Sequence, residues 1–176
     1  MSESTNATIQ FLRRLRTVRD FTADPVPDDA LADILEVGRW TGSANNRQPA
    51  EVIVVRDPEL RQKLSTAGAN TAAKANLVLV IVTAGDPTRF ELEVFDEGLL
   101  AERLQLAAAA RGIGSGITTL KGEGPDVAKQ LLGIPAEKRV RCVISVGVPD
   151  QAAITAKPKN PQPRKSITDF AHFDRY

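Results

Sequence analysis

The segment NLVLVIVT at residues 76–83 constrains the fold more than any other part of this sequence. Leucine, isoleucine and valine follow one another there, without the alternation of apolar and polar residues that marks a strand with one face in water. Its purely aliphatic stretch, Leu77–Val82, is far too short to span a bilayer. The segment therefore predicts a central β-strand that is covered on both faces.

Helix and strand patterns surround this central strand. They predict helices at 7–15, 28–40, 57–68, 91–111 and 124–132, and further strands at 51–55, 140–148 and directly after Gly112. Asp57 followed by Pro58 suits a helix start, and Gly112 suits a helix end. Because helices and strands mix without regular βαβ alternation, the pattern predicts the α+β class.

The chain has no internal repeat and no linker-like stretch before residue 151, so we expect a single domain over residues 1–176. From Gln151 to Pro163 the sequence is rich in proline, lysine and alanine and lacks periodicity. We therefore expect residues 151–176 to form an extended C-terminal arm that crosses a surface rather than packing as an element.

Composition excludes several functional classes. The net charge of +1 gives no reason to expect nucleic acid or a membrane surface as partner. One cysteine and one histidine rule out an intrachain disulfide and argue against a zinc site built by the protein. The N-terminal MSESTNATIQ lacks the basic and apolar regions of a signal peptide, so we expect a cytoplasmic protein.

The two residues that could act as nucleophile and base have ordinary structural interpretations. Cys142 shares every second position of a predicted strand with Val140, Ile144 and Val146. This spacing places the cysteine on the apolar face of that strand, as a small buried side chain. His172 lies near the C-terminus, in AHFDRY. Asp96 and the glutamates around it are interpreted as polar positions of the long helix. If the chain is an enzyme, its reactive group is expected to come from a cofactor.

Three polar segments, far apart in the sequence, suit one planar, phosphorylated ligand. Arg16-Thr17-Val18-Arg19 can present two guanidinium groups to phosphate oxygens, although a solvated basic face is an equally simple reading. Ser43–Pro49 (SANNRQP) offers amide donors and acceptors side by side, as the edge of a flavin or pyrimidine requires, or is simply a polar loop.

The third segment, Gly112–Thr119, resembles a dinucleotide-binding loop only superficially. A Rossmann loop follows a strand and opens a helix, whereas this segment follows a helix and opens an apolar stretch in which Thr118 and Thr119 could face a ligand. A basic pair, Arg164-Lys165, ends the proline-rich part of the arm. It is either part of a solvated tail or is returned by the arm to the Arg16/Arg19 site.

In this order, the segments resemble the nitroreductase family of FMN-dependent enzymes over nearly the whole chain. The matching elements are LRTVRDF with DPVPDDAL, Gly42–Ala50 (GSANNRQPA), AAAARGIG, LGIP and VGVP, and Arg164–Ile167 with AHFDRY. Each motif alone is weak, but their order over the chain makes the resemblance specific.

The resemblance implies a three-layer fold with a mainly antiparallel central sheet, and a homodimer in which the C-terminal arm reaches the partner. It further implies that Arg16, Thr17, Arg19 and Arg164 hold the phosphate and ribityl chain of FMN. Ser43, Asn46 and Gln48 are expected to reach the same flavin from the partner subunit. Ile117, Thr118 and Thr119 are expected to lie along the ring, where a backbone N–H can approach N5.

The implied activity is transfer of hydride from NADH or NADPH through FMN to a small electron-poor acceptor, such as a nitro compound or a quinone. The alternatives are a flavin-binding carrier or sensor without turnover, and a flavin enzyme of dehalogenase or cofactor-biosynthesis type. Three departures affect the expected pocket: Gly42 replaces a frequent proline, Ala50 the usual tryptophan and Leu15 a frequent arginine. They leave the acceptor, and the choice between NADH and NADPH, open.

Overall fold

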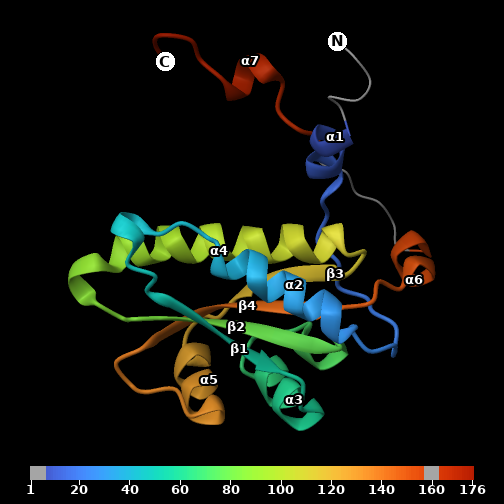
Figure 1. The fold of residues 1–176 in the computed structure, drawn as a ribbon, viewed down its shortest axis with the longest axis vertical. Helices are drawn as coiled ribbons and strands as arrows, with labels where there is room; N and C mark the ends of the chain where they lie inside the picture. Colours follow the sequence, from blue (N-terminus) through green and yellow to red (C-terminus); the bar gives the residue numbers. More distant parts are fainter. Residues whose placement is uncertain (1–6, 157–162) are drawn as a thin grey trace.

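The computed structural model describes residues 7–156 and 163–176. Its centre is a four-stranded antiparallel sheet with the strand order β1-β2-β4-β3 (Figure 1). The strands are β1 (Ala50–Val55), β2 (Leu77–Thr83), β3 (Gly114–Thr119) and β4 (Arg139–Gly147). The inner strands are β2 and β4, so β1 and β3 form the two edges.

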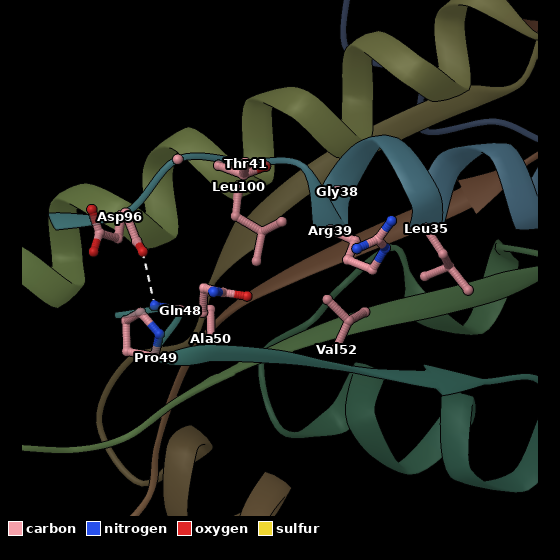
Figure 2. Close-up of a pocket in the computed structure, with 12 residues that line it drawn as sticks. Leu35, Gly38, Arg39, Thr41, Gln48, Pro49, Ala50, Val52, Asp96 and Leu100 are labelled. Carbon is pink, nitrogen blue, oxygen red and sulfur yellow. Dashed lines mark hydrogen bonds between the residues drawn. The ribbon is translucent and has the colours of Figure 1, made fainter. Parts of the chain in front are cut away.

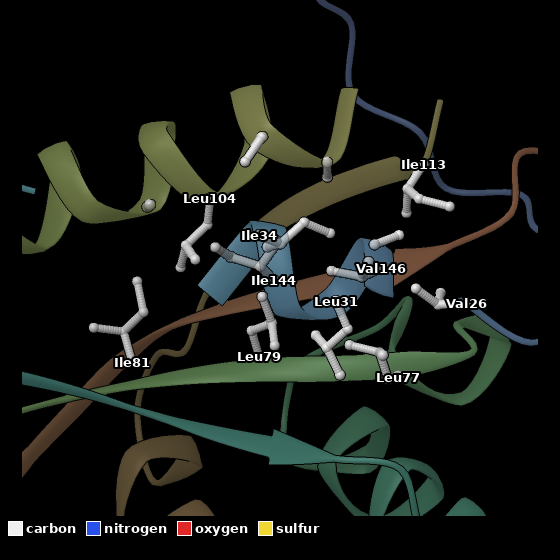
Figure 3. Packing of buried hydrophobic residues seen from close by; sticks show 14 of the residues in the cluster. Val26, Leu31, Ile34, Leu77, Leu79, Ile81, Leu104, Ile113, Ile144 and Val146 are labelled. Atoms are coloured by element: carbon white, nitrogen blue, oxygen red, sulfur yellow. The ribbon is translucent and has the colours of Figure 1, made fainter. Parts of the chain in front are cut away.

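Strand β2 confirms the prediction made from its sequence, because all its residues are buried. Leu77, Leu79 and Ile81 point into one hydrophobic cluster, and Val78, Val80 and Val82 into a second cluster on the opposite face. A continuous aliphatic run is what a strand needs when both of its faces are covered. Figure 3 shows part of the first cluster, where Leu79 and Ile81 lie close to Leu104 and Ile144.

Helices cover both faces of the sheet and make three layers. Helices α2 (Asp28–Arg39) and α4 (Phe90–Ala110) lie on one face, and α3 (Pro58–Thr66) and α5 (Gly124–Leu132) lie on the other (Figure 1). This arrangement confirms the α+β class and the expected layered, antiparallel architecture. In the described residues, none of the helices is both long enough and apolar enough to cross a bilayer.

Local signals in the sequence set several helix ends. Asp57 accepts hydrogen bonds from the backbone N–H groups of Glu59 and Leu60, which caps the start of α3, with Pro58 in the first turn. After α4, Gly112 takes a φ of +70°, a left-handed conformation that favours glycine. Both features confirm the helix boundaries predicted at these positions.

Two predictions about β4 and the C-terminal arm need correction. An extra residue in β4 sits opposite Ile81, between the pairs Val80–Val143 and Val82–Val140, so Val140 packs on the opposite face from Cys142. A strict alternation misses such a bulge. The arm does not start as an extended segment, because Gln151–Ala156 forms helix α6. The rest of the predicted extended stretch falls largely on residues 157–162, outside the described residues.

Two short helices stand away from the layered body. Figure 1 shows α1 (Ala7–Arg14) and α7 (Ile167–Phe170) above the layered body, on the side of the sheet that α4 covers. Neither has a buried residue, and both carry exposed large apolar side chains: Ile9, Leu12, Ile167 and Phe170. These faces find no cover within the described part of one chain.

Candidate functional site

The segment Arg16–Arg19 is docked along the free edge of β3. The backbone N–H of Val18 donates to the carbonyl of Ser115 at 2.8 Å. The two chains approach closely because β3 has glycine at Gly114 and Gly116. A Cβ atom on Gly116 would lie 2.6 Å from the carbonyl oxygen of Val18. The structure therefore joins two of the predicted ligand segments, and the glycines in the second of them make the contact possible.

Beyond Ser115, the edge of β3 presents backbone groups that could meet a ligand. Since Ser115 turns its carbonyl towards Val18, strand geometry turns the backbone of Ile117 and Thr119 the same way, away from β4. Among the described residues, no backbone hydrogen bond is found on this edge after Ser115. The side chains of Ile117 and Thr118 point to opposite faces of the sheet, so a single ligand can be met here by the backbone but not by every side chain.

The two arginines of the segment are exposed. Arg16 donates to the backbone carbonyls of Arg13 and Leu15 at 2.8 and 2.7 Å. Within residues 7–156 and 163–176, neither Arg16 nor Arg19 forms an ion pair with a carboxylate. Their charges are available to an anion, as the phosphate reading requires, and the same exposure is what a solvated basic face shows.

The loop at residues 43–48 has a defined and unusual backbone. Ser43 accepts a hydrogen bond from the backbone N–H of Gln48 at 2.8 Å, and Ala44–Asn46 forms a short 3-10 turn. Asn45, Asn46 and Gln48 all have φ near +53°, at 53°, 53° and 52°. Asparagine tolerates this region better than most residues, but glutamine does so rarely. Such strained backbone is found preferentially at functional sites.

Next to this loop, a cavity of about 250 Å³ lies between α2, β1 and α4 (Figure 2). Leu35, Val52 and Leu100 give it apolar walls, while Gln48 lies near Pro49 and Ala50 at the loop side. The two small residues noted in the sequence, Gly42 and Ala50, both line it. A Cβ atom on Gly42 would meet no other atom within 4 Å.

Within one chain the two halves of the predicted site stay apart. The 43–48 loop contacts the N-terminal half of α4, where Ala44 bonds to Asp96. The Arg16–Arg19 segment contacts β3, which follows the C-terminal end of α4. Figure 1 shows these regions at opposite ends of α4. The structure therefore unites Arg16, Thr17 and Arg19 with Ile117–Thr119, but not with Ser43, Asn46 and Gln48.

Arg164 belongs to the C-terminal arm and is exposed. The arm that follows it carries Phe170 and Phe173 with 76% and 86% of their surface exposed. The rings of His172 and Tyr176 lie against each other at a tilt of 46°, with centroids 4.6 Å apart. The return of Arg164 to the phosphate site stays a prediction.

From the sequence, the acidic residues of α4 are interpreted as polar positions of the long helix, but the structure buries three of them. Glu93, Asp96 and Glu97 are only 3%, 6% and 3% exposed. Burial, partly offset by the charges of Arg141 and Arg139, raises the pKa of Glu97. Helical spacing could have indicated their burial, because these residues share the face of α4 that carries Leu100 and Leu104.

Cys142 is buried as predicted, with 4% of its surface exposed. Burial, together with the nearby Glu97 carboxylate, raises the pKa of its thiol to about 12. A thiol in this state is inert as a nucleophile at neutral pH. In the described residues no cluster of three or more histidine, cysteine, aspartate or glutamate side chains could hold a metal ion.

Comparison with known proteins gives one family. The Nitroreductase family matches residues 12–84 and 68–148, which together span most of the chain. A protein of Archaeoglobus fulgidus, provisionally named NADH dehydrogenase/NAD(P)H nitroreductase, is 33% identical over 141 residues, covering 76% of this chain and 80% of the relative. The NADPH-flavin oxidoreductase of Vibrio harveyi is 28% identical over 162 residues, covering 83% and 67%.

The same family appears among solved structures. An FMN-dependent nitroreductase from Clostridium difficile R20291 superposes with a TM-score of 0.81 and covers 96% of this chain and 99% of its own. Its sequence identity of 24% makes this a likeness of fold. The antiparallel three-layer fold, the ordered motifs and the family match agree, and the chain belongs to the nitroreductase family.

Proposed function

We propose that the chain is an FMN-dependent NAD(P)H oxidoreductase that acts as a homodimer on a small electron-poor acceptor, such as a nitro compound or a quinone. The observation that carries this proposal is the docking of Arg16–Arg19 on the open edge of β3. That contact sets two arginines, which have no carboxylate partner among the described residues, beside a strand edge whose backbone N–H groups make no hydrogen bond there after Ser115. FMN requires this combination of donors, since it joins a dianionic phosphate to a flat ring with a hydrogen-bonding edge.

The donor set fits FMN residue by residue. Arg16, Thr17 and Arg19 would hold the phosphate and the ribityl chain, with Arg164 as a further cation delivered by the arm. Guanidinium forks match phosphate oxygens in geometry as well as charge. Ile117, Thr118 and Thr119 would line the ring mainly through the β3 backbone, with N–H groups directed towards the ring edge.

The remaining donors would come from the partner subunit. Leu92, Phe95 and Leu99 form an apolar stripe on α4 and are 46%, 66% and 41% exposed, which marks a surface that another molecule covers. If two α4 helices pack antiparallel about a two-fold axis, the 43–48 loop at one end of α4 meets the β3 edge of the other chain. Ser43, Asn46 and Gln48 would then complete the partner's site.

When bound, FMN would supply the redox chemistry, accepting hydride from NADH or NADPH and passing electrons to the acceptor. The chain's own residues would position the flavin and stabilise the charge that develops on it. Arg19 would place positive charge near the pyrimidine end of bound FMN, where negative charge develops on reduction. Among the described residues of this site, Arg16, Arg19 and Thr119 are exposed, so solvent would supply the proton.

The proposal also includes two predictions from the sequence: a single domain over residues 1–176 and a cytoplasmic location. A flavin-binding carrier without turnover would use the same donors. So would a dehalogenase-type enzyme with a different acceptor. These alternatives differ from an oxidoreductase in their reactions with NAD(P)H and with acceptors, and not in how they would hold FMN.

Two measurements test the proposal. Arg19→Ala and Arg164→Ala should each lose about 1.5–3 kcal/mol of FMN affinity, because each removes a charge-assisted hydrogen bond to the phosphate. FMN titrations by fluorescence quenching measure this, and wild-type affinity in both variants would refute the assigned roles.

Turnover is tested separately by adding NADH or NADPH to the FMN-loaded protein without oxygen. An oxidoreductase bleaches the flavin absorption within seconds, and a carrier leaves it unchanged. Adding a nitroarene, a quinone or a halogenated phenol to the bleached protein then identifies the acceptor class by which of them restores the colour.

A further inference from the structure

Three buried carboxylates on α4 each accept backbone N–H groups from a different segment. Glu93 accepts from Gly85 and Asp86, both at 3.0 Å, in the turn after β2. Glu97 accepts from Cys142 in β4 at 3.1 Å. Asp96 accepts from Ala44 at 3.2 Å. Two of the three thus stabilise the sheet and its turns, while Asp96 alone reaches the 43–48 loop.

The hydrogen bond to Asp96 differs from the other hydrogen bonds of the 43–48 loop. The other hydrogen bonds of the loop are internal: backbone N–H groups of Gln48 and Asn46 donate to Ser43, that of Arg47 donates to Ala44, and the Gln48 side chain donates to the carbonyl of Asn46. Among the described residues, the bond from Ala44 to Asp96 is the one hydrogen bond that ties residues 43–48 to another element. This carboxylate therefore anchors the loop to α4 by a hydrogen bond, beside the electrostatic attraction between Arg47 of the loop and Asp86.

The charge environment of Asp96 also differs from that of its neighbours. Glu93 lies 3.3 Å from Arg139, and Glu97 lies 3.8 Å from Arg141. Within the described residues Asp96 forms no ion pair, and the backbone N–H of Ala44 is the hydrogen-bond donor that compensates its burial. Burying a carboxylate to 6% exposure without a cationic partner costs folding free energy, so the stability of the helix does not explain this residue.

We propose that Asp96 is a positioning residue for the cofactor: it holds the 43–48 loop where Ser43 and Asn46 can reach the flavin of the partner subunit. The inference rests on the proposed function. The loop's backbone is strained at Asn45, Asn46 and Gln48, and a strained loop persists only where the surrounding structure fixes it. Without Asp96 the loop keeps its internal turn but loses its place on α4.

Three variants test this proposal. Asp96→Ala removes the acceptor, and Asp96→Asn keeps an acceptor oxygen at the same place. Glu97→Ala is the matched control, because it removes an equally buried carboxylate from the same helix, whose bond goes to β4 and not to the loop.

Two readouts are independent of turnover: hydrogen–deuterium exchange of the peptide that spans residues 43–49, and FMN affinity by fluorescence quenching. In Asp96→Ala we expect exchange of this peptide at least about tenfold faster and FMN binding at least about tenfold weaker, the size expected for a lost hydrogen bond to a charged group. Asp96→Asn should stay within about threefold of wild type in both. Glu97→Ala should lower the melting temperature and leave both readouts at wild-type values.

Equal exchange in wild type and Asp96→Ala would overturn the proposal, as would an equal loss of FMN affinity in Glu97→Ala. If Asp96→Ala binds FMN like the wild type, the inference fails while the proposed function stands. If the wild type binds no FMN, the proposed function fails, and the cofactor role of Asp96 fails with it.

Discussion

Replacing Gly116 with alanine should separate the Arg16–Arg19 segment from β3. The added Cβ would lie 2.6 Å from the carbonyl oxygen of Val18 and 3.2 Å from Cγ2 of Thr17. The first contact is with backbone, so it cannot be relieved by a rotamer change. The φ of Gly116 lies outside the left-handed region, so alanine is acceptable to the strand itself. The effect of the substitution is therefore confined to the contact.

The magnitude follows from two losses. Overpacking in a well-packed contact costs about 1–3 kcal/mol. Losing the bond from Val18 to Ser115 adds about 0.5–1.5 kcal/mol. If the segment shifts, Arg16 and Arg19 move with it, and one misplaced charged hydrogen bond costs about 1.5–3 kcal/mol of FMN affinity. This corresponds to roughly tenfold to a hundredfold weaker FMN binding.

The assay combines urea denaturation with FMN titration, and Leu64→Ala serves as the control. Leu64 is fully buried in the cluster on the far face of the sheet, so its truncation should cost about 2–5 kcal/mol of stability without moving the basic segment. Gly116→Ala should lose both stability and FMN affinity, and Leu64→Ala only stability. If both variants lose FMN affinity in proportion to their stability, or if Gly116→Ala keeps wild-type affinity, the docking argument is wrong.

Other predictions address the core, the thiol and the interface. Leu104→Ala, which removes a side chain that is 1% exposed between α2 and α4, should cost about 2–5 kcal/mol of unfolding free energy in urea; a loss below about 1 kcal/mol would contradict the packing. Native protein should resist a thiol reagent at pH 8 and react once unfolded, since the pKa of Cys142 is raised to about 12. Rapid labelling of the folded protein at pH 8 would contradict the burial of this thiol. Because its pKa is raised from 9.0, the stability contributed by the neutral thiol is complete below pH 9 and is lost as the pH rises towards 12. Phe95→Glu places a charge in the exposed stripe of α4 and should turn a dimer into a monomer in analytical ultracentrifugation, whereas an unchanged sedimentation coefficient would place the interface elsewhere.

Much of the fold could be predicted because local signals and tertiary burial agree. The run at 76–83 could only be a doubly covered strand, and the Asp57-Pro58 pair fixed the start of α3. The bulge that turns Val140 to the other face could not be predicted, because it depends on register between strands. Helix α6 was missed because its short sequence, QAAITA, carries no apolar periodicity.

The residue types of the candidate site could be predicted from the sequence, but the contacts that hold its segments in place could not. Arginines, amides and glycines mark ligand segments by their chemistry, and the structure brings the first and third of these segments together. The role of Asp96 was hidden, because its partner Ala44 lies 52 residues away and is a backbone group that leaves no trace in the sequence. The close approach of Gly114 and Gly116 to Val18 could not be predicted either, because it depends on a contact between segments far apart in the sequence.

The claim that one flavin site is built from two subunits is tested most directly by mixing two defective proteins. Arg19→Ala damages the basic half of the site and Asn46→Ala the loop half, and each variant alone should bind FMN poorly. After denaturation and joint refolding, a statistical mixture makes about half of the dimers mixed, and each mixed dimer carries one intact site. We predict that about a quarter of all sites regain wild-type FMN affinity; a mixture that binds no more FMN than the separate variants would contradict the shared site.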